Sequence, residues 1–289
     1  MARHNELRVL VATDGSAHAR EAIATTVRFP WPAETRVRVV VARETRADYR
    51  RSILLRALDR NAEAAADAAR RALSRRWPDV EVEIVDKTPI RGILGEAERF
   101  GADLVVLGWR GHGPAKRLLL GSVSRGVARG AKCPVLVVRR RQRVTRIVVG
   151  FDGSTAAKRA VAFVGRLTAP RDGRVTLIRV LELIQVPTRF LLGRAALARE
   201  VRQTNTRRAR TAMKELNRAA AELKRGGWTT RSILAHGEPL RDLLKEVGAS
   251  RAHLLALGAR STSGLRRLLL GSVAEGALNR SPVAVLVVR

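Results

Sequence analysis

The sequence repeats itself, and this repeat constrains the fold more than any other feature. The segment VLVATDGS at residues 9–16 matches IVVGFDGS at residues 147–154, an offset of 138 residues. The segment RLLLGSV occurs unchanged at residues 117–123 and 267–273, an offset of 150 residues. Because the match runs through both halves, we predict two domains of one fold, at residues 1–140 and 145–289, joined near the basic stretch RRRQRVTR.

Strand-like and helix-like segments alternate within each repeat. Short valine-rich runs predict strands at residues 8–12, 36–42, 80–85, 104–107 and 135–138, and at 145–149, 174–180, 229–234, 254–257 and 285–288. Helical patterns of repeat one lie at residues 16–28, 59–76, 90–100 and 122–130, and a longer helix at 195–225 replaces the second of these in repeat two. This alternation predicts an α/β fold, in which helices cover both faces of a parallel sheet.

The hydrophobic pattern and the cysteine content bear on where in the cell the protein is expected. The chain has no run of 18 apolar residues, and only four consecutive apolar residues precede Thr13, too few for a signal peptide. The single cysteine, Cys133, cannot close an intrachain disulfide. We therefore expect a cytoplasmic protein that is not exported and has no membrane partner.

The charge is strongly basic and widely spread. Lys and Arg number 56 against 26 Asp and Glu, a net charge of +30, and both halves carry an excess. Such a surface attracts polyanions, so non-specific nucleic-acid binding is one interpretation. A general preference for arginine is the other, and the even spread and only 10 aromatic residues favour it. The basic segment 204–210 is interpreted first as a solvated helix face, with a lid or a basic contact as alternatives.

In a parallel sheet of this type, ligands bind beyond the carboxyl ends of the strands. After the first strand comes Thr13-Asp14-Gly15-Ser16, which on its own indicates a helix cap rather than a ligand contact. After the fourth strand of repeat one, Gly108 and Gly111 precede Gly121-Ser122 at a helix start. Glycines and a helix N-terminus suit a phosphate, although a flexible loop ending in a serine cap is the alternative.

These motifs together resemble the universal stress protein family. The resemblance rests on the spacing Gly108-x2-Gly111-x9-Gly121-Ser122, on Asp14, and on the closing segment KCPVLVV, and the two halves resemble a tandem of such domains. It implies two Rossmann-like domains of the adenine nucleotide alpha hydrolase type. Each would hold a five-stranded parallel sheet in the order 3-2-1-4-5, with ATP, accompanied by magnesium, at the strand ends.

The resemblance also implies roles for individual residues. In repeat one, adenine would lie against Thr13, Asp14 and Ala42. The ribose and phosphates would be lined by Gly108 and Gly111 and held by Gly121, Ser122, Val123 and Ser124.

In repeat two the corresponding site residues are Asp152, Val180, Gly258, Ser261, Gly271 and Ser272. Ser261 stands where repeat one has Gly111, so we expect an altered second site that fills after the first.

The sequence thus predicts an ATP-binding regulatory protein of the stress response. A slow ATPase or nucleotidyl-transfer enzyme on the same site is an alternative, but no catalytic residue stands out and no metal-ligand spacing is present. The expected partners are an adenine nucleotide and an unidentified protein. We also expect the repeats to pack as an intramolecular pseudo-dimer through their last strands, with further homodimerisation open.

Overall fold

The computed structural model describes residues 6–43, 53–110, 120–184, 195–259 and 270–289, with the backbone alone over 53–56. The described elements of repeat one are β1 (Leu7–Ala12), α1 (Ala17–Arg28), β2 (Thr35–Arg43), α2 (Ile53–Leu73), β3 (Glu81–Asp86), α3 (Pro89–Phe100), β4 (Leu104–Gly108), α4 (Ser122–Gly130) and β5 (Val135–Val138). Those of repeat two are β6 (Arg146–Gly150), α5 (Thr155–Gly165), β7 (Arg174–Leu181), α7 (Ala195–Arg225), β8 (Thr229–His236), α8 (Pro239–Ala249), β9 (Leu254–Gly258), α9 (Ser272–Arg280) and β10 (Ala284–Val288).

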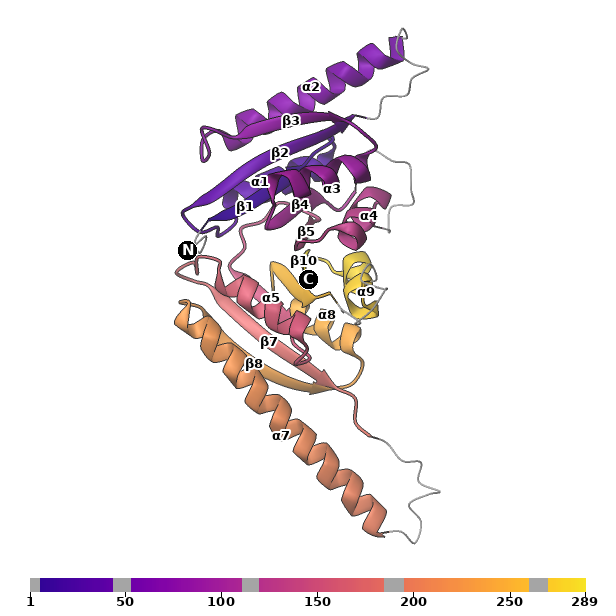
Figure 1. Cartoon of the computed structure of the whole chain (residues 1–289). Helices are drawn as coiled ribbons and strands as arrows, with labels where there is room; N and C mark the ends of the chain where they lie inside the picture. The colour runs from indigo at the N-terminus through magenta and orange to yellow at the C-terminus, as the bar shows by residue number, and fades with distance from the viewer. Residues whose placement is uncertain (1–5, 44–52, 111–119, 185–194, 260–269) are drawn as a thin grey trace.

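The strands form one continuous ten-stranded sheet in the order β3-β2-β1-β4-β5-β10-β9-β6-β7-β8 (Figure 1). Within each repeat all neighbours are parallel and follow the order 3-2-1-4-5, as the family resemblance implied. The repeats join where β5 and β10 pair antiparallel, with Leu136 opposite Leu286. The predicted pairing of the two last strands is therefore confirmed.

Two apolar cores cover the two faces of the sheet, and each runs through both repeats. One core joins buried side chains of α1, α2, α5 and α7 to alternate strand residues such as Val9 and Ile147. The other joins α3, α4, α8 and α9 to the strand residues between them, such as Leu10 and Val148. Alternation along a strand sends successive side chains to opposite faces, so strands of valine and leucine are buried on both sides. Among the described helices, none has the length and apolarity needed to cross a membrane.

Arginines tie the two repeats together reciprocally beside the central strands. Arg139 Nη2 donates to the Asn279 carbonyl at 2.6 Å, and Arg289 Nη2 donates to the Arg129 carbonyl at 2.6 Å. These contacts correspond under the 150-residue offset, so they express a pseudo-two-fold relation between the repeats. Burial lowers the pKa of both Arg139 and Arg289.

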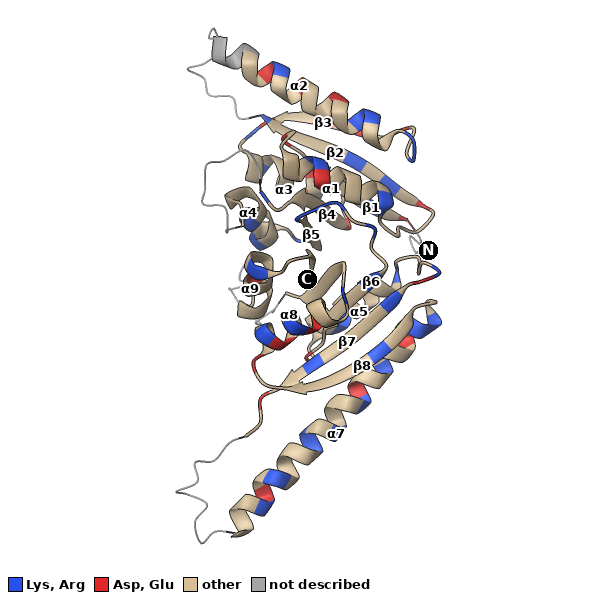
Figure 2. Cartoon of the chain, turned by 180° about the vertical axis from the view of Figure 1, so that it is seen from behind, with Lys and Arg blue, Asp and Glu red and all other residues tan. Residues whose placement is uncertain are grey.

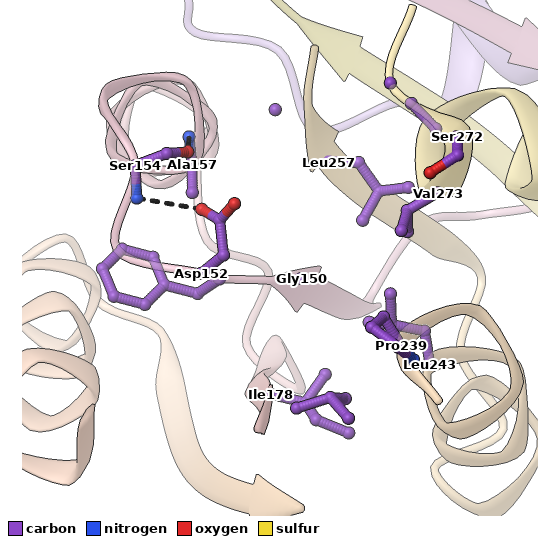
Figure 3. Close-up of a pocket in the computed structure, with 15 residues that line it drawn as sticks. Gly150, Asp152, Ser154, Ala157, Ile178, Pro239, Leu243, Leu257, Ser272 and Val273 are labelled. Carbon is purple, nitrogen blue, oxygen red and sulfur yellow. Dashed lines mark hydrogen bonds between the residues drawn. The ribbon is translucent and has the colours of Figure 1, made fainter. Parts of the chain in front are cut away.

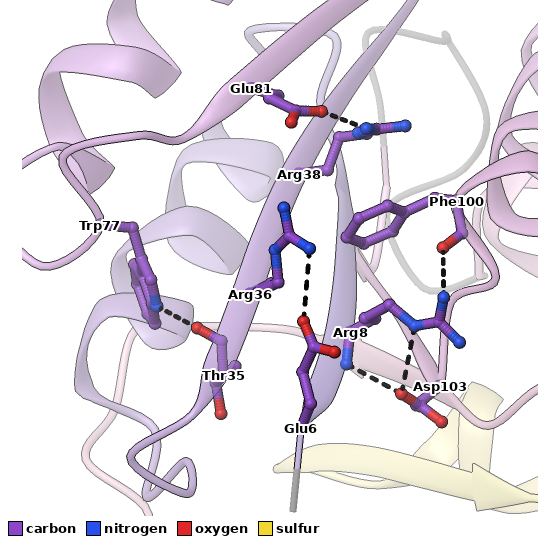
Figure 4. A network of polar contacts seen from close by, with 9 residues as sticks. All are labelled: Glu6, Arg8, Thr35, Arg36, Arg38, Trp77, Glu81, Phe100 and Asp103. Carbon is purple, nitrogen blue, oxygen red and sulfur yellow. Dashed lines mark hydrogen bonds and ion pairs between the residues drawn. The ribbon is translucent and has the colours of Figure 1, made fainter. Parts of the chain in front are cut away.

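The structure corrects the predicted bounds of one helix. We expected a helix over residues 59–76, but α2 spans Ile53–Leu73. Its end is set by a turn in which the N–H groups of Arg76 and Trp77 both reach the Leu73 carbonyl, at 3.0 and 2.9 Å. The Trp77 indole then donates to the Thr35 carbonyl at 2.8 Å, which draws the chain back toward β2 (Figure 4).

Polar contacts fasten the amino ends of the strands in repeat one. The Arg8 backbone N–H donates to Asp103 Oδ2 at 2.8 Å, and its side chain donates to the Phe100 carbonyl at 3.2 Å (Figure 4). Arg38 stacks on the Phe100 ring at 4.5 Å and pairs with the fully buried Glu96 at 3.0 Å. These residues have partners within the repeat, at the edge of the sheet opposite the carboxyl ends of the strands.

The central strand pair predicts where the chain is most sensitive to substitution. Leu286→Ala removes a fully buried side chain at the β5–β10 junction, so we expect the free energy of unfolding to fall by about 2–5 kcal/mol in urea denaturation. Leu183→Ala, the same change at a residue that is 44% exposed, is expected to cost less than about 0.5 kcal/mol. Equal effects of the two substitutions would contradict this assignment of the central core.

The single cysteine is a packing residue after α4. Burial raises the pKa of the Cys133 thiol to about 11. At pH 8 the native thiolate fraction is then roughly two hundred times smaller than that of an ordinary thiol, and alkylation by iodoacetamide should be slower by that factor than in urea. The native rate should rise about tenfold from pH 8 to pH 9, because the group is still mostly protonated. Equal native and denatured rates at pH 8 would disprove this.

Candidate functional site

Each repeat holds a cavity at the carboxyl ends of its first, second and fourth strands. The cavity of repeat one measures about 90 Å³, and that of repeat two about 210 Å³ (Figure 3). The first is lined by Ala12, Thr13, Asp14, Ala19, Val40, Ala42, Pro89, Ile93, Leu107, Gly108, Arg110, Val123 and Ser124. The second is lined by Gly150, Phe151, Asp152, Ser154, Ala157, Ile178, Val180, Pro239, Leu243, Leu257, Gly258, Gly271, Ser272, Val273 and Ala274.

Most of the predicted site residues therefore come together at these cavities. In repeat one the cavity wall includes Thr13, Asp14, Ala42, Gly108, Val123 and Ser124. In repeat two it includes Asp152, Val180, Gly258, Gly271 and Ser272. Gly121 and Ser122 lie at the N-terminus of α4, next to lining residue Val123. Gly111 and Ser261 lie outside the described residues.

The Asp-Gly-Ser segment builds the corner between the first strand and helix. Asp14 Oδ1 accepts the Ser16 N–H at 3.0 Å, and Ser16 Oγ accepts the Ala19 N–H at 3.3 Å as the N-cap of α1. Gly15 between them has φ +75°, a left-handed conformation that favours glycine. The capping role predicted for this segment is thus confirmed.

Repeat two builds the same corner. Asp152 Oδ1 accepts the Ser154 N–H at 2.9 Å, and Ser154 Oγ accepts the Ala157 N–H at 3.1 Å (Figure 3). Gly153 has φ +86°. In both repeats the turn holds an aspartate at the rim of the cavity.

The glycine that ends the fourth strand has a packing role that the sequence analysis missed. A Cβ on Gly108 would lie 2.6 Å from the backbone of His18, and a Cβ on Gly258 would lie 2.4 Å from the backbone of Ala156. Both distances are far below van der Waals contact. Glycine is therefore needed here so that the first helix of each repeat can approach the fourth strand, and its presence says nothing by itself about a ligand.

The helix after the fourth strand begins at the cavity without a side-chain cap. Gly121 and Gly271 are the N-caps of α4 and α9, and neither helix receives a capping hydrogen bond from a side chain. The N–H groups of the first turn, from Ser122 onward, have no acceptor within the helix, and the helix dipole adds partial positive charge. The Gly121 N–H itself donates to the Trp109 carbonyl at 3.0 Å, which closes the base of the loop.

The two repeats carry different residues at the third position of this helix, Ser124 and Ala274. The Ser124 hydroxyl is buried and donates to the Gly108 carbonyl at 2.7 Å, so the side chain joins α4 to β4. Ala274 holds the corresponding place in repeat two and provides no hydroxyl. Because the hydroxyl proton is already donated to Gly108, any contact of Ser124 with an anion would come from its backbone N–H.

The sequence analysis also missed the wall that α3 and α8 contribute. Pro89 and Ile93 line the first cavity, and Pro239 and Leu243 line the second. The available signal was a proline at the same place in both repeats, which suits the first turn of a helix that begins directly after the third strand.

The described residues offer little for metal or acid–base chemistry. Among them, no group of three or more His, Cys, Asp or Glu side chains could hold a metal ion. Asp14 is the one carboxylate among the described lining residues of the first cavity, and Asp152 of the second. Magnesium at either site would therefore be held mainly by the phosphates of a nucleotide.

Comparison with known proteins places the chain in a family. The profile of the universal stress protein family matches residues 7–139 and again residues 143–289. A universal stress protein of Mycobacterium tuberculosis is 31% identical over 228 residues, which cover 73% of this chain and 69% of the relative. One from Thermus aquaticus is 36% identical over 133 residues, covering 45% of this chain and 97% of that protein.

A solved structure supports the same fold over the whole chain. The crystal structure of a universal stress protein from Archaeoglobus fulgidus matches with a TM-score of 0.67 at 19% identity, covering 98% of this chain and 96% of that one. The two family matches fall on the two repeats of the ten-stranded sheet. The chain therefore belongs to the universal stress protein family, as a tandem of two of its domains.

Proposed function

We propose that this chain is an ATP-binding regulatory protein of the cytoplasm, with one nucleotide site at the strand ends of each repeat. The observation that carries the proposal is the duplicated arrangement of an apolar cavity beside a helix whose first-turn N–H groups have no side-chain cap. An adenine ring suits the first half of this arrangement and a phosphate the second. The occurrence of both halves in both repeats supports the proposal.

In repeat one, different residues would contact the adenine and the phosphates of the nucleotide. Val40, Ala42 and Ile93 give an apolar wall for adenine, and Asp14 offers an acceptor at its edge. The N–H groups of Ser122, Val123 and Ser124 would hold phosphate oxygens, with magnesium shared among the phosphates. Arg110, which also lines this cavity, brings a positive charge to the site.

A regulatory role is favoured over rapid turnover. The carboxylate at the rim of each cavity, Asp14 or Asp152, already accepts a hydrogen bond from the turn that holds it. It is therefore poorly placed to take a proton as a general base. The alternative, slow ATP hydrolysis or nucleotidyl transfer, predicts product release when the protein is incubated with ATP and magnesium.

Substitutions at the helix N-termini test the proposed phosphate sites. Gly121 has φ −59° and ψ 148°, which any residue adopts, so Gly121→Val should fold while its side chain blocks the approach to α4. We expect ATP binding at repeat one to weaken tenfold or more by calorimetry, and Gly271→Val to do the same at repeat two. Gly248→Val is the control, because a Cβ there meets nothing within 4 Å. Unchanged affinity in both site variants would refute the proposed phosphate site.

The two proposed sites differ at the position where repeat one has Gly111 and repeat two has Ser261. If the position of Ser261 requires a left-handed backbone or close approach, its Cβ costs on the order of 1 kcal/mol relative to Gly111. Ser261→Gly should then strengthen ATP binding at repeat two about fivefold and leave repeat one unchanged. Ser261→Ala keeps the Cβ and should bring no gain. Two identical sites in the unmodified chain, or equal responses to Gly and Ala, would show that this serine does not distinguish the sites.

A further inference from the structure

The solvent-facing side of α7 carries a row of basic residues, which we call the α7 stripe: Arg207, Arg210, Lys214, Arg218 and Arg225. At 3.6 residues per turn they fall on the side of the helix opposite its buried residues, Ala212, Leu216, Ala219 and Leu223. All five are exposed. Within the described part of the chain, no ion pair joins any of them to an acidic residue.

The equivalent helix of repeat one provides an internal comparison. Helix α2 holds four basic and three acidic residues, whereas α7 holds nine basic and three acidic ones, and Figure 2 shows the basic positions recurring along α7. The outer face of α2 carries two basic and two acidic residues, Arg60, Glu63, Asp67 and Arg71. A general preference for arginine would act on both helices alike. The α7 stripe therefore needs a separate explanation.

The spacing of the α7 stripe suits a row of phosphates. The first four stripe residues follow one another at three or four positions, about 4.5–6 Å along the helix axis, and Arg225 follows Arg218 after seven positions, about 10.5 Å. One strand of a nucleic-acid duplex carries a phosphate charge about every 3.4 Å of its axis, so each stripe residue has a phosphate within reach. Arg210, Lys214 and Arg218 also line a shallow groove on this face. The guanidinium groups of the stripe can each pair with two phosphate oxygens.

Two other polyanionic partners fit less well. A membrane-binding helix needs an apolar face to insert, but the apolar residues of α7 pack against the sheet of repeat two. Single-stranded nucleic acid is held largely by stacking on aromatic rings, and α7 contains no aromatic residue. A duplex backbone requires only the cations that the α7 stripe supplies.

We propose that the α7 stripe is a binding surface for the phosphate backbone of duplex nucleic acid, without sequence preference. This function belongs to repeat two, since the matching face of α2 in repeat one has no net charge along its outer row. It is separate from the nucleotide sites and requires no bound ATP.

The test compares two variants with the same change in net charge. A short fluorescent DNA duplex of mixed sequence is titrated with the full chain over a series of salt concentrations. Arg210→Gln, Lys214→Gln and Arg218→Gln combined should weaken binding at least tenfold at low salt and reduce the slope of log K against log salt by about 2.7, for three lost phosphate contacts. The control combines Arg60→Gln, Arg71→Gln and Arg75→Gln, all exposed in repeat one, and should change affinity less than threefold.

Each outcome decides for or against the α7 stripe. Equal weakening by the two triple variants would show that net charge alone binds DNA, which overturns the proposal. Tighter binding of a single strand than of the duplex, or binding only to vesicles of anionic phospholipid, would overturn it as well. If circular dichroism shows that the α7 triple variant is unfolded, the single substitution Lys214→Gln should still lower the slope of log K against log salt by about 0.9. An unchanged slope in that variant would count against the proposal.

Discussion

The antiparallel pairing of β5 with β10 is the contact on which the whole arrangement depends. Each of these strands would otherwise be a short, fully apolar edge, exposed to pairing with another chain. Their pairing places them at the centre of a ten-stranded sheet and makes both apolar cores continuous across the repeats. The second repeat thus supplies within one chain the partner that the first repeat needs.

The joined sheet also connects one candidate site to the opposite repeat. Trp109 follows β4 at the edge of the first cavity, and its indole Nε1 donates to the Leu278 carbonyl of α9 at 3.0 Å. Arg139 covers its ring at 3.7 Å. Repeat two has Ala259 at the corresponding place, which cannot make these contacts. The chain directly after β4 is therefore anchored to repeat two, whereas Ala259, directly after β9, makes no such contact.

The fold could be predicted from the sequence because its main signals are local and occur twice. Runs such as residues 104–107 and 254–257 are apolar throughout, as strands buried on both faces must be, and α7 has the predicted bounds, Ala195–Arg225. The end of α2 at Leu73 was not predicted, and the contact that follows it, from the Trp77 indole to the Thr35 carbonyl, joins residues 42 positions apart. The wall from α3 and α8 was missed because a cavity is made by packing between elements, which periodicity along the chain does not encode.

Some glycines of the motif have structural roles that require no ligand. Gly108 allows close packing of α1, and Gly15 allows a left-handed turn, so both would be required with no ligand present. Gly121 does not need a left-handed conformation, since its backbone angles suit any residue. Its place as the N-cap of α4 is what relates it to the proposed phosphate site.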